Sequence, residues 1–231
     1  MDALVNRLNN SVNCCRRRFG FTIIELLIVM SLLGIATTLV SAAYLSFEKR
    51  ERVKSAALDL KSNLRLAQNK ALSGDKGIPG SPAQCNNTSQ TLIGWFVRID
   101  TDTTIPVNNY EIMIACQNTP GDEEHYVFKN VDLPEGVSFT DFEYSNDFVI
   151  AGSFIPLNNT GLYKILFRTL DREIYVFDDS PSFYDSDGNF NKLWGSTDVT
   201  GQIAFKLAIN GFDTTYEVTV FTDGEINEKK L

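Results

Sequence analysis

The longest apolar stretch of the chain covers residues 21–47, and Glu25 is the only charged residue within it. A helix rises about 1.5 Å per residue, so a helix of this length can cross a hydrocarbon core of roughly 30 Å. An ionised carboxylate costs roughly 2.5–3.5 kcal/mol on membrane-insertion scales, so Glu25 needs a compensating role. The sequence therefore predicts a membrane-spanning helix over 21–47 with a functional carboxylate near its start.

The residues just before this stretch form a basic run that ends in a glycine. Three arginines, residues 16–18, precede Gly20, and Glu25 is the fifth residue after that glycine. The sequence from Gly20 to Val29 resembles the leader junction of type IV prepilins and type II secretion pseudopilins. In that family a membrane-embedded aspartyl peptidase cuts after the glycine and methylates the new N-terminal amine.

This resemblance implies the processing residues, the partners and the location. Residues 1–20 would be a leader peptide, with cleavage and methylation at Gly20 and Phe21. The implied partners are a prepilin peptidase/methyltransferase, other pilin or pseudopilin subunits, and membrane lipid. Four basic residues lie on each side of the apolar stretch, so charge alone does not set its orientation. The family implies a single-pass protein of the bacterial inner membrane, with a cytoplasmic leader and an extracytoplasmic head, that can be extracted into a pilus or pseudopilus.

Electrostatics offers a physical reason for Glu25. An intramembrane ionisable group is expected to have a partner, and a charged amine on Phe21 of a neighbouring subunit would provide one. Opposite charges attract strongly where the dielectric constant is low, so this pair would favour one register between adjacent subunits. Methylation leaves the amine charged and so preserves the interaction.

Two other interpretations of the apolar stretch stay open. A secretory signal peptide has an apolar core of roughly 7–15 residues before a small-residue cleavage site, and Ser41-Ala42-Ala43 would provide such a site. The stretch is longer than that and has Glu25 at its start. An ordinary single-pass anchor with Glu25 at the membrane interface is the second alternative. Ala42 stands where pilins often have a proline, so the helix kink that such a proline causes is not implied here.

Helical periodicity continues beyond the apolar stretch. Apolar residues recur at spacings of three and four over residues 48–73, which is typical of an amphipathic helix with one buried face. Ser73-Gly74 ends the pattern, since glycine commonly follows the last helical turn. The two segments together predict a continuous helix of roughly 50 residues, about 75 Å long. The expected buried stripe consists of Val53, Ala57, Leu60, Leu64, Ala67 and Ala71.

The remaining segment, residues 74–231, has the pattern of one β-rich head. A loop over 75–87 contains glycines and prolines, and short runs of β-branched and aromatic residues follow it. Strands this close together favour antiparallel pairing, because a parallel crossover needs about a dozen residues or more. The predicted fold class is α+β, a long N-terminal helix packed on an antiparallel β-rich head, as in pilins. The expected strands are 91–99, 110–116, 125–131, 148–155, 162–169, 173–177, 203–209 and 216–222.

The four cysteines divide between the leader and the head. Cys14 and Cys15 fall in the leader, where a reducing cytosol is expected. Cys85 and Cys116 are the two cysteines of the expected mature chain. Two cysteines in an exported domain are a candidate disulfide, and two buried free thiols are the alternative.

Motifs for catalysis or metal binding are scarce. The only histidine is His125, which excludes a two-histidine zinc motif, and no nucleophile elbow or phosphate-binding glycine loop occurs. Asp185, Asp187 and Asn189 offer oxygens at alternating positions, as at the start of a calcium loop. The glycine falls at the fourth position instead of the sixth, and Ser196 replaces the bidentate glutamate, so a solvated turn is the favoured interpretation. We expect no enzymatic activity and no cofactor.

Sequence details of the head and the charge of the chain bear on the kind of subunit. Segments 93–97, 133–137 and 218–226 resemble the H-type minor pseudopilins and related minor pilins, and the head is larger than major pseudopilins usually carry. The formal net charge is −8, and the leader carries +3, so the mature chain would be −11. Such a chain repels nucleic-acid phosphates, so no nucleic-acid partner is favoured. The sequence predicts a structural pilus or pseudopilus subunit; the alternative is a minor pilin that binds DNA or a surface at a pilus tip.

Overall fold

The computed structural model describes Gly20, Cys85 and residues 22–77, 90–100, 107–119, 122–146, 155–156, 161–169, 174–178, 183–184 and 201–231. The chain divides into two compact units, with the boundary between Ser46 and Phe47. One long helix and antiparallel strands make up the described residues, which confirms the predicted α+β, pilin-like fold class.

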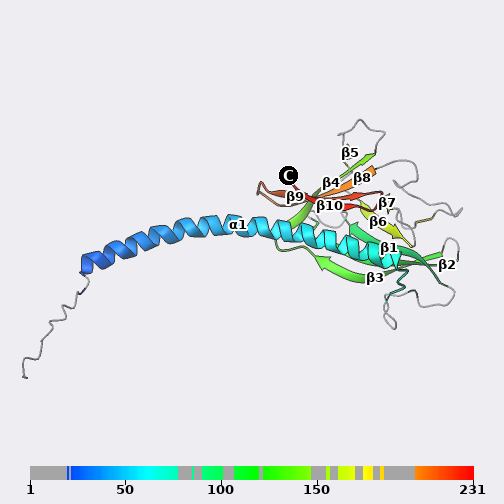
Figure 1. The fold of residues 1–231 in the computed structure, drawn as a ribbon, viewed down its shortest axis with the longest axis horizontal. Helices are drawn as coiled ribbons and strands as arrows, with labels where there is room; N and C mark the ends of the chain where they lie inside the picture. Colours follow the sequence, from blue (N-terminus) through cyan, green and yellow to red (C-terminus); the bar gives the residue numbers. More distant parts are fainter. Residues whose placement is uncertain are drawn as a thin grey trace, which may run out of the picture. The chain divides into compact units, whose positions relative to one another are not determined.

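Helix α1 runs continuously over Ile23–Leu72, and Ala42 lies within it (Figure 1). It ends in a Schellman motif, because the N–H of Asp75 donates to the carbonyl of Lys70 (3.0 Å) and the N–H of Gly74 donates to that of Ala71 (3.0 Å). Gly74 has a φ of +65°, which residues other than glycine rarely adopt. The predicted helix end at Ser73-Gly74 is therefore confirmed.

The strands form two five-stranded sheets in which every neighbouring pair is antiparallel, as predicted. The first sheet has the order β3-β2-β1-β6-β7 and the second has the order β10-β9-β8-β4-β5 (Figure 1). The strand bounds are β1 Thr91–Asp100, β2 Asn109–Thr119, β3 Asp122–Asp132, β4 Val137–Asn146, β5 Ile155–Pro156, β6 Leu162–Arg168, β7 Ile174–Asp178, β8 Gly201–Ile209, β9 Thr215–Phe221 and β10 Ile226–Lys230.

Two strands are absent from the sequence prediction. β4 escapes a period-two pattern because its register against β8 shifts between Phe139 and Asp141, so that the buried residues Phe139 and Phe142 are three apart instead of two. β10 is only five residues long and mostly polar. The strand expected over 148–155 lies outside the described residues except for Ile155, which belongs to β5.

The main hydrophobic core lies between the two sheets and α1. The predicted helical stripe is confirmed, because each of its members is fully buried, and Ala56 adds a seventh buried apolar position. Small residues dominate the stripe, which lets the helix backbone approach the strands closely. The helix residues in the core are Val53, Ala56, Ala57, Leu60, Leu64, Ala67 and Ala71.

Side chains of α1 also cover the edge strand of the second sheet. Arg65 donates to the carbonyl of Ile226 (3.3 Å) and Gln68 donates to the carbonyl of Gly224 (2.9 Å), while Lys61 pairs with Glu228 of β10. An uncovered edge strand is a template for unwanted strand pairing. The polar face of the helix thus protects this edge.

Candidate processing and assembly segment

The predicted cleavage junction directly precedes the first turn of α1. Gly20 is exposed, and Phe21 lies outside the described residues. The side chain of Thr22 accepts a hydrogen bond from the N–H of Glu25 (3.3 Å), and the carbonyl of Thr22 accepts one from the N–H of Leu26 (3.1 Å). Thr22 is therefore the N-cap of the helix.

The capping role of Thr22 is a feature that the sequence prediction missed. The Thr-x-x-Glu pattern over residues 22–25 is the sequence signature of a capping box and could have revealed it. Glu25 occupies the first turn of α1, where the helix dipole favours a negative charge. The position of Glu25 is thus compatible with helix initiation, and its pairing with the amine of another subunit stays a prediction.

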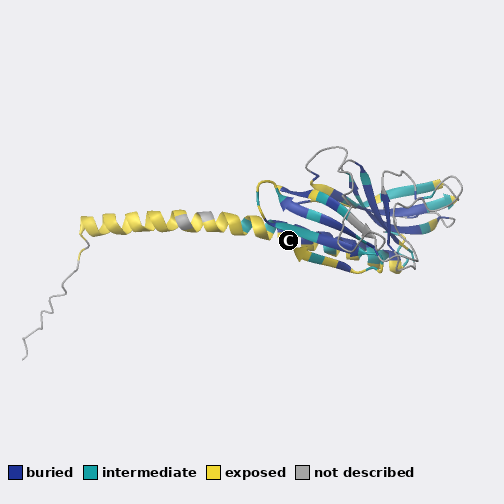
Figure 2. Cartoon of the chain, turned by 90° about the horizontal axis from the view of Figure 1, so that it is seen from above, coloured by how far each residue is buried: buried dark blue, intermediate teal, exposed yellow. Residues whose placement is uncertain are grey.

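The first part of α1 presents an apolar surface on all sides. From Ile23 to Phe47 the large apolar side chains that the structure describes are exposed, and Ile23 is 83% exposed. Figure 2 shows this part as exposed, whereas the later part carries buried positions. A helix that is apolar all round is typical of a membrane span, and α1 is long and apolar enough to cross a bilayer.

Serine and threonine hydroxyls within this apolar surface are paired with the helix backbone. Each donates to a carbonyl three or four residues earlier, at 2.8–2.9 Å. An unpaired polar group in hydrocarbon costs several kcal/mol by order of magnitude, so internal pairing makes these residues compatible with lipid. The residues are Ser31, Thr37, Thr38, Ser41 and Ser46.

The two head cysteines form a disulfide in the structure. Cys85 and Cys116 have Cα atoms 5.6 Å apart and lie 31 residues apart in sequence. Cys116 belongs to β2 and is fully buried, while the N–H of Cys85 donates to the carbonyl of Lys76 (2.9 Å). The bridge therefore fastens the segment after α1 to a central strand of the first sheet.

Polar contacts secure the same region. Lys70 Nζ lies 2.7 Å from the carboxylate of Asp75 and 4.7 Å from the ring centre of Trp95, whose indole N–H donates to the carbonyl of Asp75 (2.7 Å). Burial by itself raises the pKa of Asp75, but the hydrogen bonds from Lys70 and from the N–H of Gly77 outweigh it and lower the pKa. The end of α1 is thus tied to β1 by several contacts.

The remaining candidate residues concern metal binding. The calcium candidates Asp185, Asp187 and Asn189 lie outside the described residues. Among the residues that are described, no group of three histidine, cysteine or acidic side chains could hold a metal ion. The imidazole of His125 lies 3.2 Å from the carboxylate of Glu123 and belongs to a packed cluster on the first sheet.

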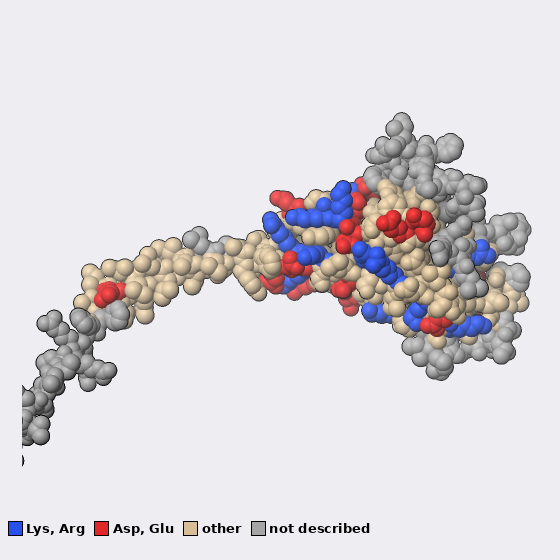
Figure 3. Space-filling view, in the orientation of Figure 1, with Lys and Arg blue, Asp and Glu red and all other residues tan. Residues whose placement is uncertain are grey.

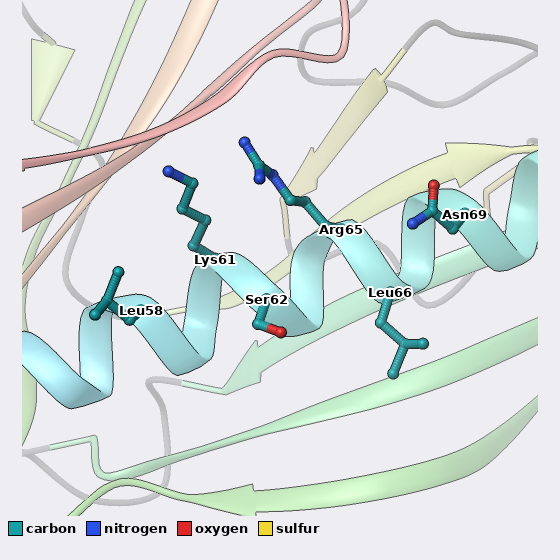
Figure 4. A pocket seen from close by; sticks show the side chains of 6 residues that line it. All are labelled: Leu58, Lys61, Ser62, Arg65, Leu66 and Asn69. Atoms are coloured by element: carbon teal, nitrogen blue, oxygen red, sulfur yellow. The ribbon is translucent and has the colours of Figure 1, made fainter.

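A surface pocket lies on the outward side of α1, and Figure 4 shows the side chains that line it. Its cations already have partners, because Lys61 pairs with Glu228 and Arg65 donates to the carbonyl of Ile226. We therefore assign it no ligand. The lining residues are Leu58, Lys61, Ser62, Arg65, Leu66 and Asn69.

Comparison with known families supports the interpretation of the junction. Residues 15–41 match the family model described as the prokaryotic N-terminal methylation motif. This motif places the chain in the type IV pilin and pseudopilin superfamily. No curated protein and no solved structure matches the chain.

The matched motif has direct consequences for the expected role of the chain. Proteins of this superfamily are structural subunits and not enzymes. The motif implies processing by a prepilin peptidase and assembly with other pilins. Together with the apolar helix it implies anchoring in the inner membrane before assembly into a pilus or pseudopilus.

Proposed function

We propose that this pilin-like protein is a minor subunit of a type IV pilus or a type II secretion pseudopilus, made as a prepilin that is cut after Gly20. The observation that carries the proposal is the junction itself, where the motif glycine immediately precedes a capped helix with an exposed apolar surface. Cleavage there would leave Phe21 as a methylated N-terminus and Glu25 in the first turn behind it. The domains would be a leader over 1–20, a membrane and assembly helix over 21–47, an amphipathic helix over 48–73 and a head over 74–231.

The assignment as a minor subunit rests on the head. The segments 93–97, 133–137 and 218–226 that resemble minor pseudopilins lie on β1, on the turn before β4 and on the β9–β10 hairpin. A head built from two five-stranded sheets is also large for a major pseudopilin.

Intact-mass spectrometry tests the processing step. The chain co-expressed with a prepilin peptidase should lose residues 1–20 and gain one methyl group, and Gly20→Ala should stay uncut. Gly34→Ala is a matched control, since a Cβ at Gly34 meets no atom within 4 Å, and it should be processed normally. A cut after Ala43 in the unmodified chain would assign the segment to signal peptidase and overturn the proposal.

The assembly role of Glu25 has a separate test. Glu25→Val should insert into the membrane at least as well as the unmodified chain, because it removes a charge from an apolar segment. It should nevertheless fail to join cross-linked assemblies if the carboxylate pairs with a neighbouring amine. Glu51→Val, on the later part of α1, should assemble normally. Normal assembly of Glu25→Val would refute the pairing.

The alternative role, DNA capture at a pilus tip, requires a basic stripe. On the face of the head shown in Figure 3, basic and acidic side chains alternate instead of forming such a stripe. The mature chain in detergent should therefore show no salt-sensitive DNA binding in an anisotropy titration. Micromolar binding that weakens steeply between about 50 and 200 mM salt would move this alternative to first place.

A further inference from the structure

The first sheet carries a second apolar cluster on the face opposite the main core. Most of its members alternate with core residues along the strands, as expected for a sheet that is covered on both faces. Phe183 is the exception, because it comes from the chain between β7 and β8 and still belongs to this cluster. The members are Ile93, Phe96, Met113, Ala115, Leu166, Tyr175, Phe177 and Phe183.

Phe183 is held as an anchor by side chains from four strands. It is fully buried, and its ring centre lies 4.7 Å from that of Phe177, 5.1 Å from that of Phe96 and 5.0 Å from that of His125. Lys164 Nζ lies 5.2 Å from the same ring centre. These residues come from β7, β1, β3 and β6, so the pocket for this ring spans most of the sheet.

The main chain of the same segment is held by one buried carboxylate. The two oxygens of Glu123 accept hydrogen bonds from the N–H groups of Phe183 and Tyr184, both at 2.9 Å. The side chain of Glu123 is only 3% exposed and also contacts His125. Burial alone raises the pKa of Glu123, but the hydrogen bonds from His125 and from the two N–H groups outweigh it and lower the pKa, which keeps the acceptor charged.

Basic side chains lie beside Phe183 and Tyr184, and the neighbours of these two residues in the sequence are acidic. Lys164 is buried beside the anchor ring, and Arg168 is close enough to Tyr184 to influence its pKa. In the sequence, Phe183-Tyr184 is flanked by Asp178 and Asp179 on one side and by further aspartates on the other. Proteins recognise short peptides by a pocket for an aromatic ring, by hydrogen bonds to the peptide main chain and by side chains whose charge is opposite to that of the peptide.

We propose that this outer face of the first sheet is a peptide-docking groove, lined by Phe96, Glu123, His125, Lys164 and Phe177, that recognises an aromatic anchor flanked by acidic residues. In the chain as it stands, the groove is filled by the chain's own Phe183-Tyr184. The segment therefore acts as an internal competitor, and an acidic aromatic peptide binds only when Phe183 leaves its pocket.

Binding of a separate synthetic peptide to the full chain in detergent micelles tests the proposal. A labelled synthetic peptide of residues 178–187 should bind the Phe183→Ala variant saturably. Its apparent affinity for the unmodified chain should be weaker by about tenfold or more, because affinity falls with the fraction of open grooves. The same peptide with alanine at the Phe183 position is the control and should not bind. Equal binding of the two peptides, or equal binding to the two proteins, would overturn the proposal.

Hydrogen exchange tests the hydrogen bonds that Glu123 accepts from Phe183 and Tyr184 in a variant that retains the Phe183 side chain. In Glu123→Ala the amides of Phe183 and Tyr184 should exchange about tenfold or more faster than in the unmodified chain, because bonds to charged acceptors are among the stronger ones. Glu124→Ala is the matched control: Glu124 is the next residue of β3 and bonds to Tyr126 and Asn118 instead. Equal exchange at the two amides in both variants would refute the docking role of Glu123.

Discussion

The two parts of α1 on either side of the Ser46–Phe47 boundary form one helix but differ in what surrounds them. From Ile23 to Ser46 the described large apolar side chains are exposed, whereas over 47–72 one stripe of apolar residues is buried and most of the other residues are polar. The later part carries contacts to the head through Asn63, Lys61 and Gln68.

The difference shows that the distribution of apolar residues around a helix reflects what the helix contacts. A helix that packs on its own chain needs only one apolar face. A helix that is apolar all round must meet lipid or other subunits, so its stabilising partners lie outside the chain. The same substitution should therefore have different effects in the two parts, and this expectation can be tested.

The largest expected effect is at the buried stripe. Leu60→Ala should lower the free energy of unfolding of the head by about 2–5 kcal/mol, because Leu60 is fully buried. Leu58→Ala is the control on the same part of the helix, since Leu58 is 42% exposed. Leu32→Ala is the control on the first part, and both controls should stay within about 0.5 kcal/mol. Denaturant unfolding in detergent micelles, followed by near-ultraviolet circular dichroism, measures the stability of all three variants. A large loss of stability in Leu32→Ala would contradict the proposed difference between the two parts of α1.

Removal of the disulfide should have the next largest effect. Replacing Cys85 and Cys116 by serine opens a loop of 31 residues, which should lower the stability of the head by about 3.7 kcal/mol in the chain-entropy model. Membrane insertion of the first part of α1 should be unchanged. Free-thiol labelling of the unfolded, unreduced mature chain checks the bridge first, and two labels per chain would contradict it.

A buried polar contact of the later part predicts a pH dependence. Asn63 donates to the hydroxyl of Tyr110 (2.6 Å), and burial raises the pKa of Tyr110 to about 12 from 10.0. The folded state holds this proton more tightly than the unfolded state, so the contribution is complete below pH 10 and is lost as the pH rises towards 12. The full loss is about 2–3 kcal/mol.

The variant Tyr110→Phe isolates this effect from other titrating groups. The difference in unfolding free energy between the unmodified chain and the variant should shrink as the pH rises from 9 to 11. A difference that stays constant over this range would mean that Tyr110 titrates alike in both states.

The smallest expected effect concerns the polar face of the later part. Lys61 and Glu228 are partly exposed, with side-chain exposures of 19% and 30%. Lys61→Met should change stability by about 1 kcal/mol or less, and the change should decrease in high salt. Lys54→Met, at the more exposed pair of Lys54 and Glu51, should change it less still. Salt-dependent unfolding of both variants provides the comparison.

Local pattern was enough to predict α1 and its stripe. Spacings of three and four located the buried face, and Ser73-Gly74 located the end, because both signals arise from neighbours along one helix. The alternation of β4 failed as a signal because a bulge near Asp141 breaks it. The contact between Glu123 and Phe183 gave no signal, since it joins residues 60 positions apart.

The sequence by itself determined the membrane helix, the cleavage motif and the antiparallel β-rich class, because each depends on residues that are close together in the chain. Only the tertiary structure decided the order of the strands in the two sheets, the bridge between Cys85 and Cys116 and the burial of Phe183 against the outer face of the first sheet. These features depend on which distant segments meet. The packing of the whole core determines which distant segments contact each other, and local sequence patterns do not contain this information.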